Sequence, residues 1–179
     1  MKVYYVRHGQ TDWNLARRMQ GGGTEKALNE TGLKQAEQTR KELENVDYDI
    51  VIRSPMHRAE QTAEIINQGR NVPIIVDERM RERKLGKLEG HPITNEMESR
   101  IWNYELNAPI NGGESLHEFE KRILDFLEDI KQKYKDKTVL IVAHGGVAKV
   151  LKAHLYGMPE TKDLSEIKME NCEIIETEL

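Results

Sequence analysis

Two short runs of β-branched and aromatic residues in this chain end in the same way, at a histidine followed by glycine. Residues 3–6 predict a buried strand that stops at Arg7-His8-Gly9. Residues 138–143 predict another strand, the fourth along the chain, which stops at residues 144–146, His-Gly-Gly, and is followed by a helix from residue 147 towards residue 156. Parallel α/β sheets are built from such units, and they bind ligands at the carboxyl ends of their strands.

The stretch between these two runs alternates between predicted strands and helices. Further strands are expected at residues 49–53 and 73–76, where β-branched residues cluster. The expected helices are marked by cap residues and apolar periodicity: one from an N-cap at Thr31 to about Leu43, one over residues 56–66 behind Ser54 and Pro55, one over residues 94–106, and one that begins at the capping box of Ser115 and Glu118 and is the longest in the chain.

A length of 179 residues suits one sizeable α/β domain. We expect this domain to span residues 1–179, with a small helical insertion at about residues 91–114 between the third and fourth strands. In the tail, residues 166–169 and residues 172–177 resemble strands, and they predict a hairpin or edge strands.

Charge and composition narrow the classes of function. The formal net charge is −4, so the chain has no overall basic field that would attract nucleic acid or an acidic membrane surface. Cys172 is the single cysteine, which fits a reducing compartment. The sequence shows no apolar signal segment and no membrane-length run, and we therefore expect a cytoplasmic protein.

Four side chains that suit phosphate chemistry fall at strand ends or helix starts. Arg7 and His8 follow the first strand, His144 follows the strand at residues 138–143, and Arg58 begins the helix after the second strand. In a parallel sheet these side chains converge at one edge, where two arginine forks can bind a tetrahedral dianion. A neutral imidazole can then act as the nucleophile and form a phosphohistidine.

The leaving alkoxide needs a proton, and Glu82 is the candidate general acid because it follows the third strand. Alternatives stay open at this point. Glu82 stands in a charge-dense stretch, which is typical of a solvated surface, and a neighbouring carboxylate could serve instead. Arg7 and His8 taken alone also fit a solvated arginine and a packed histidine at a strand end.

Five motifs in this order resemble the histidine phosphatase superfamily, also called the phosphoglycerate mutase-like superfamily. They are RHGQTDWN at residues 7–14, QG at 20–21, SPMHRAEQT at 54–62, RERKLGKLEG at 81–90 and AHGG at 143–146. The resemblance implies a three-layer, doubly wound α/β fold with a mainly parallel sheet and helices on both faces. It also implies an enzyme that needs no metal and no organic cofactor.

The resemblance further implies a role for each matching residue. His8 would be phosphorylated, Arg7, Arg58 and His144 would complete the phosphate pocket, and Glu82 would be the general acid. The residues that match substrate-side positions are Thr11, Asn14, Gln20, Gly21 and Gly145. The loop at residues 21–27 departs from the aspartate-containing pattern of the family, so its geometry is not predicted.

The superfamily contains phosphatases and mutases, and the sequence favours the phosphatase branch. Mutases carry an arginine pair in the insertion, whereas this chain has Arg100 alone, and Leu85 replaces their tyrosine near the acid. We therefore expect a phosphomonoester hydrolase that acts on a small phosphorylated metabolite, as a monomer or homodimer. The alternatives are a cofactor-dependent phosphoglycerate mutase and a catalytically silent member that binds phosphorylated ligands.

Overall fold

The computed structural model describes residues 1–179 and contains one five-stranded sheet. Three short 3₁₀ helices, at Glu78–Met80, Gly86–Leu88 and Leu164–Glu166, lie in the connections. The strands and α-helices follow in chain order: β1 (Lys2–Arg7), α1 (Asp12–Leu15), α2 (Glu30–Glu42), β2 (Ile50–Arg53), α3 (His57–Asn67), β3 (Ile74–Val76), α4 (Asn95–Trp102), α5 (Leu116–Lys133), β4 (Thr138–Ala143), α6 (Gly145–Tyr156) and β5 (Ile174–Glu178).

The sheet has the strand order β3-β2-β4-β1-β5, and all neighbouring strands except β1 and β5 run parallel. The register pairs Arg7 with Ala143 at the carboxyl ends of β1 and β4. His8 and His144, each one residue further along, therefore leave the sheet side by side. β5 closes one edge of the sheet as an antiparallel strand.

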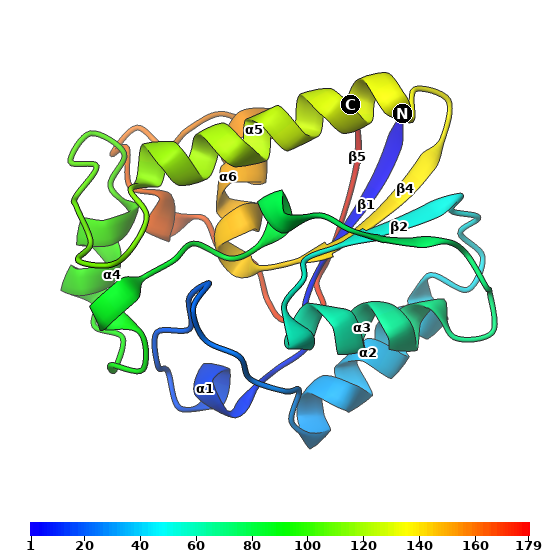
Figure 1. Cartoon of the computed structure of the whole chain (residues 1–179), viewed down its shortest axis with the longest axis horizontal. Helices are drawn as coiled ribbons and strands as arrows, with labels where there is room; N and C mark the ends of the chain where they lie inside the picture. The colour runs from blue at the N-terminus through cyan, green and yellow to red at the C-terminus, as the bar shows by residue number, and fades with distance from the viewer.

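Helices cover both faces of the sheet, as Figure 1 shows, with α5 and α6 on one side and α2 and α3 on the other. Side chains alternate along β1, so Val3 and Tyr5 belong to the core beneath α5 and α6, while Tyr4 and Val6 belong to the core above α2 and α3. The expected three-layer α/β fold is confirmed.

Two expected N-caps are wrong. Helix α2 is capped by Asn29, whose side chain accepts a hydrogen bond from the Gly32 N–H at 2.9 Å, because this strong cap residue stands two positions before Thr31. Helix α3 begins at His57 after Met56, which makes no side-chain cap. The Ser54 hydroxyl lies instead 2.6 Å from Nε2 of His144.

The tail and the insertion also differ from expectation. Only β5 forms a strand in the tail, because residues 164–169 turn their carbonyl groups towards lysines of α6 and towards Arg7 rather than towards a neighbouring strand. In the insertion, α4 ends at Trp102, four residues before Leu106. The Asn103 side chain accepts a hydrogen bond from the Leu106 N–H at 2.9 Å, which stabilises a turn there.

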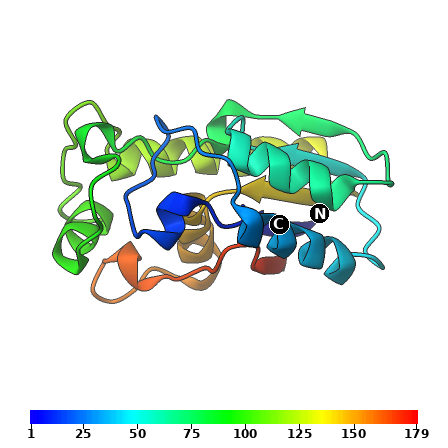
Figure 2. The ribbon, with the colours of Figure 1, turned by 90° about the horizontal axis from the view of Figure 1, so that it is seen from below.

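The two chain ends meet at the end of the sheet remote from the histidines. The Met1 amino group donates to the carbonyl of Leu179 at 3.2 Å, and the Leu179 N–H donates to the carbonyl of Met1 at 3.0 Å. Figure 2 shows α4 and its surroundings beyond the other end of the strands, far from both termini. No helix combines the length and the apolar character that crossing a bilayer requires.

The packing of α5 makes a prediction about stability. Phe126 of α5 is completely buried in the core, so Phe126→Ala should lower the free energy of unfolding by about 3–5 kcal/mol, through lost burial and a residual cavity. Lys121→Ala, on the exposed side of the same helix, should change it by less than about 0.5 kcal/mol. Urea denaturation of both variants measures the difference, and equal effects would contradict the packing described.

Candidate active site

His8 has a hydrogen-bonding pattern that assigns its tautomer. Its Nδ1 lies 2.7 Å from the carbonyl oxygen of Gly9, an acceptor, so Nδ1 carries the proton. Its Nε2 accepts a hydrogen bond from Nε of Arg58 at 3.2 Å, so a lone pair points towards the guanidinium. Burial and the positive charges of Arg58 and Arg7 hold the pKa of His8 well below its usual value. The imidazole is therefore neutral at neutral pH and retains a nucleophilic nitrogen.

His144 lies across from His8, with the two ring centroids 5.2 Å apart. The hydroxyl group of Tyr5 fixes its backbone, donating to the His144 carbonyl at 2.6 Å and accepting from the His144 N–H at 2.9 Å. Burial, Arg58, His8 and Arg7 hold the pKa of His144 well below its usual value. Its Nδ1 is buried without a hydrogen-bond partner.

The two predicted arginines approach the histidines from different elements. Arg7, at the end of β1, donates through its Nη1 to the carbonyl of Met169, and its Nε is buried without a partner. Arg58, in the first turn of α3, is completely buried, and burial lowers its pKa to about 10. Arg58 therefore remains cationic at neutral pH, and so does Arg7 despite a pKa that burial also lowers.

The glycine loop at residues 21–24 holds the guanidinium of Arg58. The carbonyl of Thr24 accepts from Nη1 of Arg58 at 2.8 Å, and that of Gly21 accepts from Nη2 at 3.4 Å. Glu89 fixes the loop by accepting hydrogen bonds from the Gly23 N–H at 3.1 Å and from the Thr24 hydroxyl. A Cβ at Gly22 would overlap the carbonyl oxygen of Glu82, so the loop packs this closely only with glycine there.

Glu82 is 8% exposed, and its side chain faces the same cleft as His8. The charge-dense sequence around Glu82 would equally have suited a solvated surface position. Its Oε2 accepts from the N–H of Gly146 at 2.9 Å, in the first turn of α6, and its Oε1 accepts from the N–H of Arg83 at 2.8 Å. A Cβ at Gly146 would overlap both this carboxylate and the Trp102 ring. Glycine at position 146 therefore allows the carboxylate to sit against the start of α6.

The predicted substrate-side residues form a linked group at α1. The Thr11 hydroxyl caps α1 and donates to Oε1 of Gln20 at 2.8 Å, while Oδ1 of Asn14 accepts from the Thr11 N–H at 3.0 Å. Asn171 was not singled out from the sequence. Its Nδ2 donates to the His8 carbonyl at 2.9 Å and lies 3.4 Å from Oδ1 of Asn14, so it connects His8 to this group.

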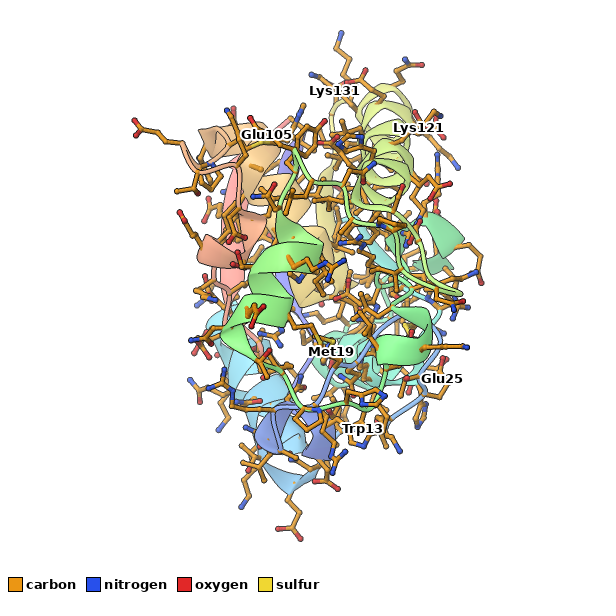
Figure 3. The ribbon with its side chains drawn as sticks, turned by 90° about the vertical axis from the view of Figure 1, so that its left-hand side faces the viewer. Trp13, Met19, Glu25, Glu105, Lys121 and Lys131 are labelled. Carbon is orange, nitrogen blue, oxygen red and sulfur yellow. The ribbon has the colours of Figure 1, made fainter.

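These side chains surround a cleft of about 180 Å³ at the insertion end of the molecule, the end onto which Figure 3 looks and where the cleft residue Met19 is labelled. Six of the predicted residues line it: Arg7, His8, Asn14, Gln20, Glu82 and Gly145. The other four, Arg58, His144, Thr11 and Gly21, are buried and reach the cleft through the contacts described above.

No sequence signal pointed to several of the cleft residues, among them Arg83 and Lys149. Trp102 comes from the insertion, and its closeness to the site depends on how α4 folds back, which no sequence pattern indicated. No group of three or more histidine, cysteine, aspartate or glutamate side chains is arranged to hold a metal ion.

Comparison with known proteins places this geometry in a family. The model of the histidine phosphatase superfamily (branch 1) matches residues 3–179. The chain belongs to this superfamily. The resemblance seen in the five sequence motifs is thereby confirmed.

Relatives within the histidine phosphatase superfamily carry both phosphatase and mutase names. The chain is 40% identical over 155 residues to the uncharacterized phosphatase PhoE of Bacillus subtilis, covering 87% of this chain and 77% of that protein. It is 33% identical over 180 residues to GpmB of Erwinia tasmaniensis, named a probable phosphoglycerate mutase, covering 97% and 83%. The solved structure of YhfR from Bacillus stearothermophilus matches with a TM-score of 0.85 at 35% identity, covering 96% of this chain and 87% of that one.

The depressed pKa values of the two histidines predict how stability changes with pH. In the unfolded chain each histidine binds a proton below about pH 6.5, whereas the folded protein keeps both neutral there, so protons favour unfolding. The free energy of unfolding should fall as the pH is lowered from about 7 to about 5.5, by up to about 1.4 kcal/mol per histidine per pH unit. Urea denaturation at a series of pH values measures this slope.

His144→Asn removes one of these groups and should make the slope shallower. The matched control is His154→Asn, because His154 is exposed on α6, and this variant should keep the wild-type slope. A slope unchanged by His144→Asn would show that His144 does not stay neutral in the folded protein.

Proposed function

We propose that this protein hydrolyses phosphomonoesters of small metabolites through a phosphohistidine on Nε2 of His8. One observation carries the proposal: the Nδ1 proton of His8 is held by the Gly9 carbonyl, while its Nε2 lone pair faces the Arg58 guanidinium. A nucleophilic nitrogen beside a buried cation suits in-line attack on a phosphorus whose oxygens that cation binds.

The two arginines would supply the charge stabilisation of this transfer. Three of the five N–H groups of Arg58 are used by His8, Thr24 and Gly21, which leaves two for phosphoryl oxygens. The unpartnered Nε of Arg7 and the start of α6, which Gly145 brings to the cleft, complete a cationic surround. We propose that this charge replaces a metal ion, so that hydrolysis is independent of metals.

Glu82 would act first as the acid and then as the base. As the phosphorus–oxygen bond of the ester breaks and the nitrogen–phosphorus bond forms, the leaving alkoxide takes the proton of the Glu82 carboxyl group. Water then attacks the phosphohistidine, giving its proton to the Glu82 carboxylate, and the nitrogen–phosphorus bond breaks to release phosphate. The Gly146 N–H holds the Glu82 carboxylate at the cleft, which supports its position for this proton transfer.

The insertion supports the mutase alternative less well than it supports the phosphatase. Its single arginine, Arg100, is exposed and does not line the cleft. A mutase must also protect its phosphoenzyme from water. Because some relatives are named as mutases, the experiment below also tests this alternative. It also tests whether the protein is a silent member that only binds phosphorylated ligands.

The first experiment measures phosphate release from p-nitrophenyl phosphate and from a panel of phosphorylated metabolites, with EDTA present. The wild type should hydrolyse several of them and show a transient phosphoprotein by mass spectrometry after rapid mixing, and His8→Ala should show neither. The panel includes 3-phosphoglycerate with its bisphosphate, scored for isomerisation. Isomerisation without phosphate release would establish the mutase, and binding without turnover would establish the silent member.

A second experiment assigns the acid. Glu82→Gln should slow hydrolysis of alkyl phosphates by about 10²–10⁴-fold, because their alkoxide leaving group needs a proton. Hydrolysis of p-nitrophenyl phosphate should slow much less, since p-nitrophenolate leaves unprotonated. Glu98→Gln is the matched control, because Glu98 is another carboxylate lining the cleft. A loss in Glu98→Gln that depends on the leaving group would move the role to Glu98.

A further inference from the structure

Helix α6 begins at His144 without the side-chain cap that most helices of this protein have. Four of the six α-helices are capped by the side chain of their own N-cap residue, which is Thr11, Asn29, Thr94 or Ser115. The His144 side chain makes no such bond, and its Nε2 lies instead 2.6 Å from Oγ of Ser54. The backbone of His144 therefore needs a hydrogen-bond partner from elsewhere in the chain.

Tyr5 supplies this partner from the neighbouring strand β1. Its hydroxyl group accepts from the His144 N–H at 2.9 Å and donates to the His144 carbonyl at 2.6 Å. The same carbonyl also accepts a hydrogen bond of α6, from the Ala148 N–H at 3.0 Å, so both of its lone pairs are used. One hydroxyl group thus holds both backbone polar groups of His144, and it has no other hydrogen-bond partner.

The Tyr5 side chain is itself held in place. It is 1% exposed and packs in the core beneath α5 and α6. Burial and the charge of Glu82 hold the pKa of Tyr5 well above its usual value, against opposing contributions from the bond to His144 and from Arg7. The hydroxyl group therefore keeps its proton and remains a hydrogen-bond donor.

Two groups of the candidate active site depend on the backbone that Tyr5 holds. One is the His144 imidazole itself, and the other is the Gly146 N–H, two residues further along, which donates to Oε2 of Glu82 at 2.9 Å. Gly145 and Gly146 carry no side chain that would restrain this turn, and a Cβ at Gly146 would overlap the Glu82 carboxylate. The Tyr5 hydroxyl group therefore restrains a segment that its own residues leave unrestrained.

We propose that Tyr5 is a positioning residue for the phosphoryl transfer: its hydroxyl group, by holding the backbone of His144, sets the direction of the His144 imidazole and the place of the Glu82 carboxylate. This inference rests on the proposed hydrolysis at His8. Tyr5 does not line the cleft, so it acts only through these two groups.

Removal of the hydroxyl group should lower kcat more than it changes KM. In Tyr5→Phe the His144 N–H loses its acceptor, and we expect kcat for alkyl phosphates to fall about 10–100-fold, the effect of a displacement of about 1 Å. KM should change by less than about threefold, because Arg7 and Arg58 keep their own contacts. Hydrolysis of p-nitrophenyl phosphate, whose leaving group needs no acid, should also slow and reports the contribution of His144. The additional loss with alkyl phosphates reports that of Glu82.

Tyr48→Phe is the matched control, because it removes the same group from the opposite core. Tyr48 is 5% exposed, and its hydroxyl group donates to the Ile66 carbonyl at 3.3 Å, away from α6. This variant should leave kcat and KM unchanged. An equal loss of kcat in Tyr48→Phe and Tyr5→Phe would indicate a general loss of packing and would overturn the proposal.

Analogues of tyrosine at position 5 separate hydrogen bonding from packing. The analogue 4-aminophenylalanine both donates and accepts hydrogen bonds, and it should restore most of the kcat lost in Tyr5→Phe. The analogue 4-fluorophenylalanine fills the space of the hydroxyl group without a proton to donate, and it should not restore kcat. This comparison remains decisive where Tyr5→Phe does not fold. Equal kcat values with the two analogues would overturn the proposal.

Failure of this inference is distinguishable from failure of the proposed function. Hydrolysis by the wild type with an equal kcat in Tyr5→Phe would overturn only the role of Tyr5. Without any turnover by the wild type, calorimetric affinities for orthovanadate, which mimics the five-coordinate phosphorus of the transfer, measure the same positioning. Tyr5→Phe should then bind vanadate about tenfold or more weakly and inorganic phosphate about as well as the wild type. An unchanged vanadate affinity would again overturn the proposal.

Discussion

The parallel pairing of β1 with β4 is the constraint on which the site depends. Its register places Arg7 opposite Ala143, so the two histidines leave the sheet next to each other. The His8 N–H extends the ladder by donating to the Ala143 carbonyl at 2.9 Å, and the Tyr5 hydroxyl holds the backbone of His144 from the neighbouring strand. A slip of one residue would turn Tyr5 to the opposite core and separate the histidines.

Much of the fold could be predicted because its signals are local. A run of buried strand residues followed by histidine and glycine shows where the strand ends. In the same way, the Ser115–Glu118 capping box marks the start of α5 as expected. The wrong N-caps at Thr31 and Ser54 arose where two cap residues compete, or where a hydroxyl group finds a distant partner. The strand expected at residues 166–169 failed because side chains far away in the sequence take up its carbonyl groups.

The candidate site likewise contains some residues that have a local sequence signal and others that have none. Arg7, His8, Arg58, Glu82 and His144 could be picked out because each follows a strand or begins a helix, and the structure brings all five together. Asn171, Glu89 and Lys149 could not, since their contacts are with backbone groups remote in the sequence. Only the position of α4 shows that Trp102 and Glu82 both lie against Gly146. Their side-chain types gave no signal of these contacts.

The meeting of the two chain ends has a consequence for how the architecture is connected. Met1 and Leu179 are already hydrogen-bonded, at the end of the sheet away from the cleft. A short covalent link between them would therefore demand no rearrangement, and new ends could be opened in an exposed connection elsewhere. We therefore expect the arrangement of the candidate site residues to be set by the packed layers rather than by the order in which the chain connects them. Circular permutation of this protein should preserve the geometry of the site.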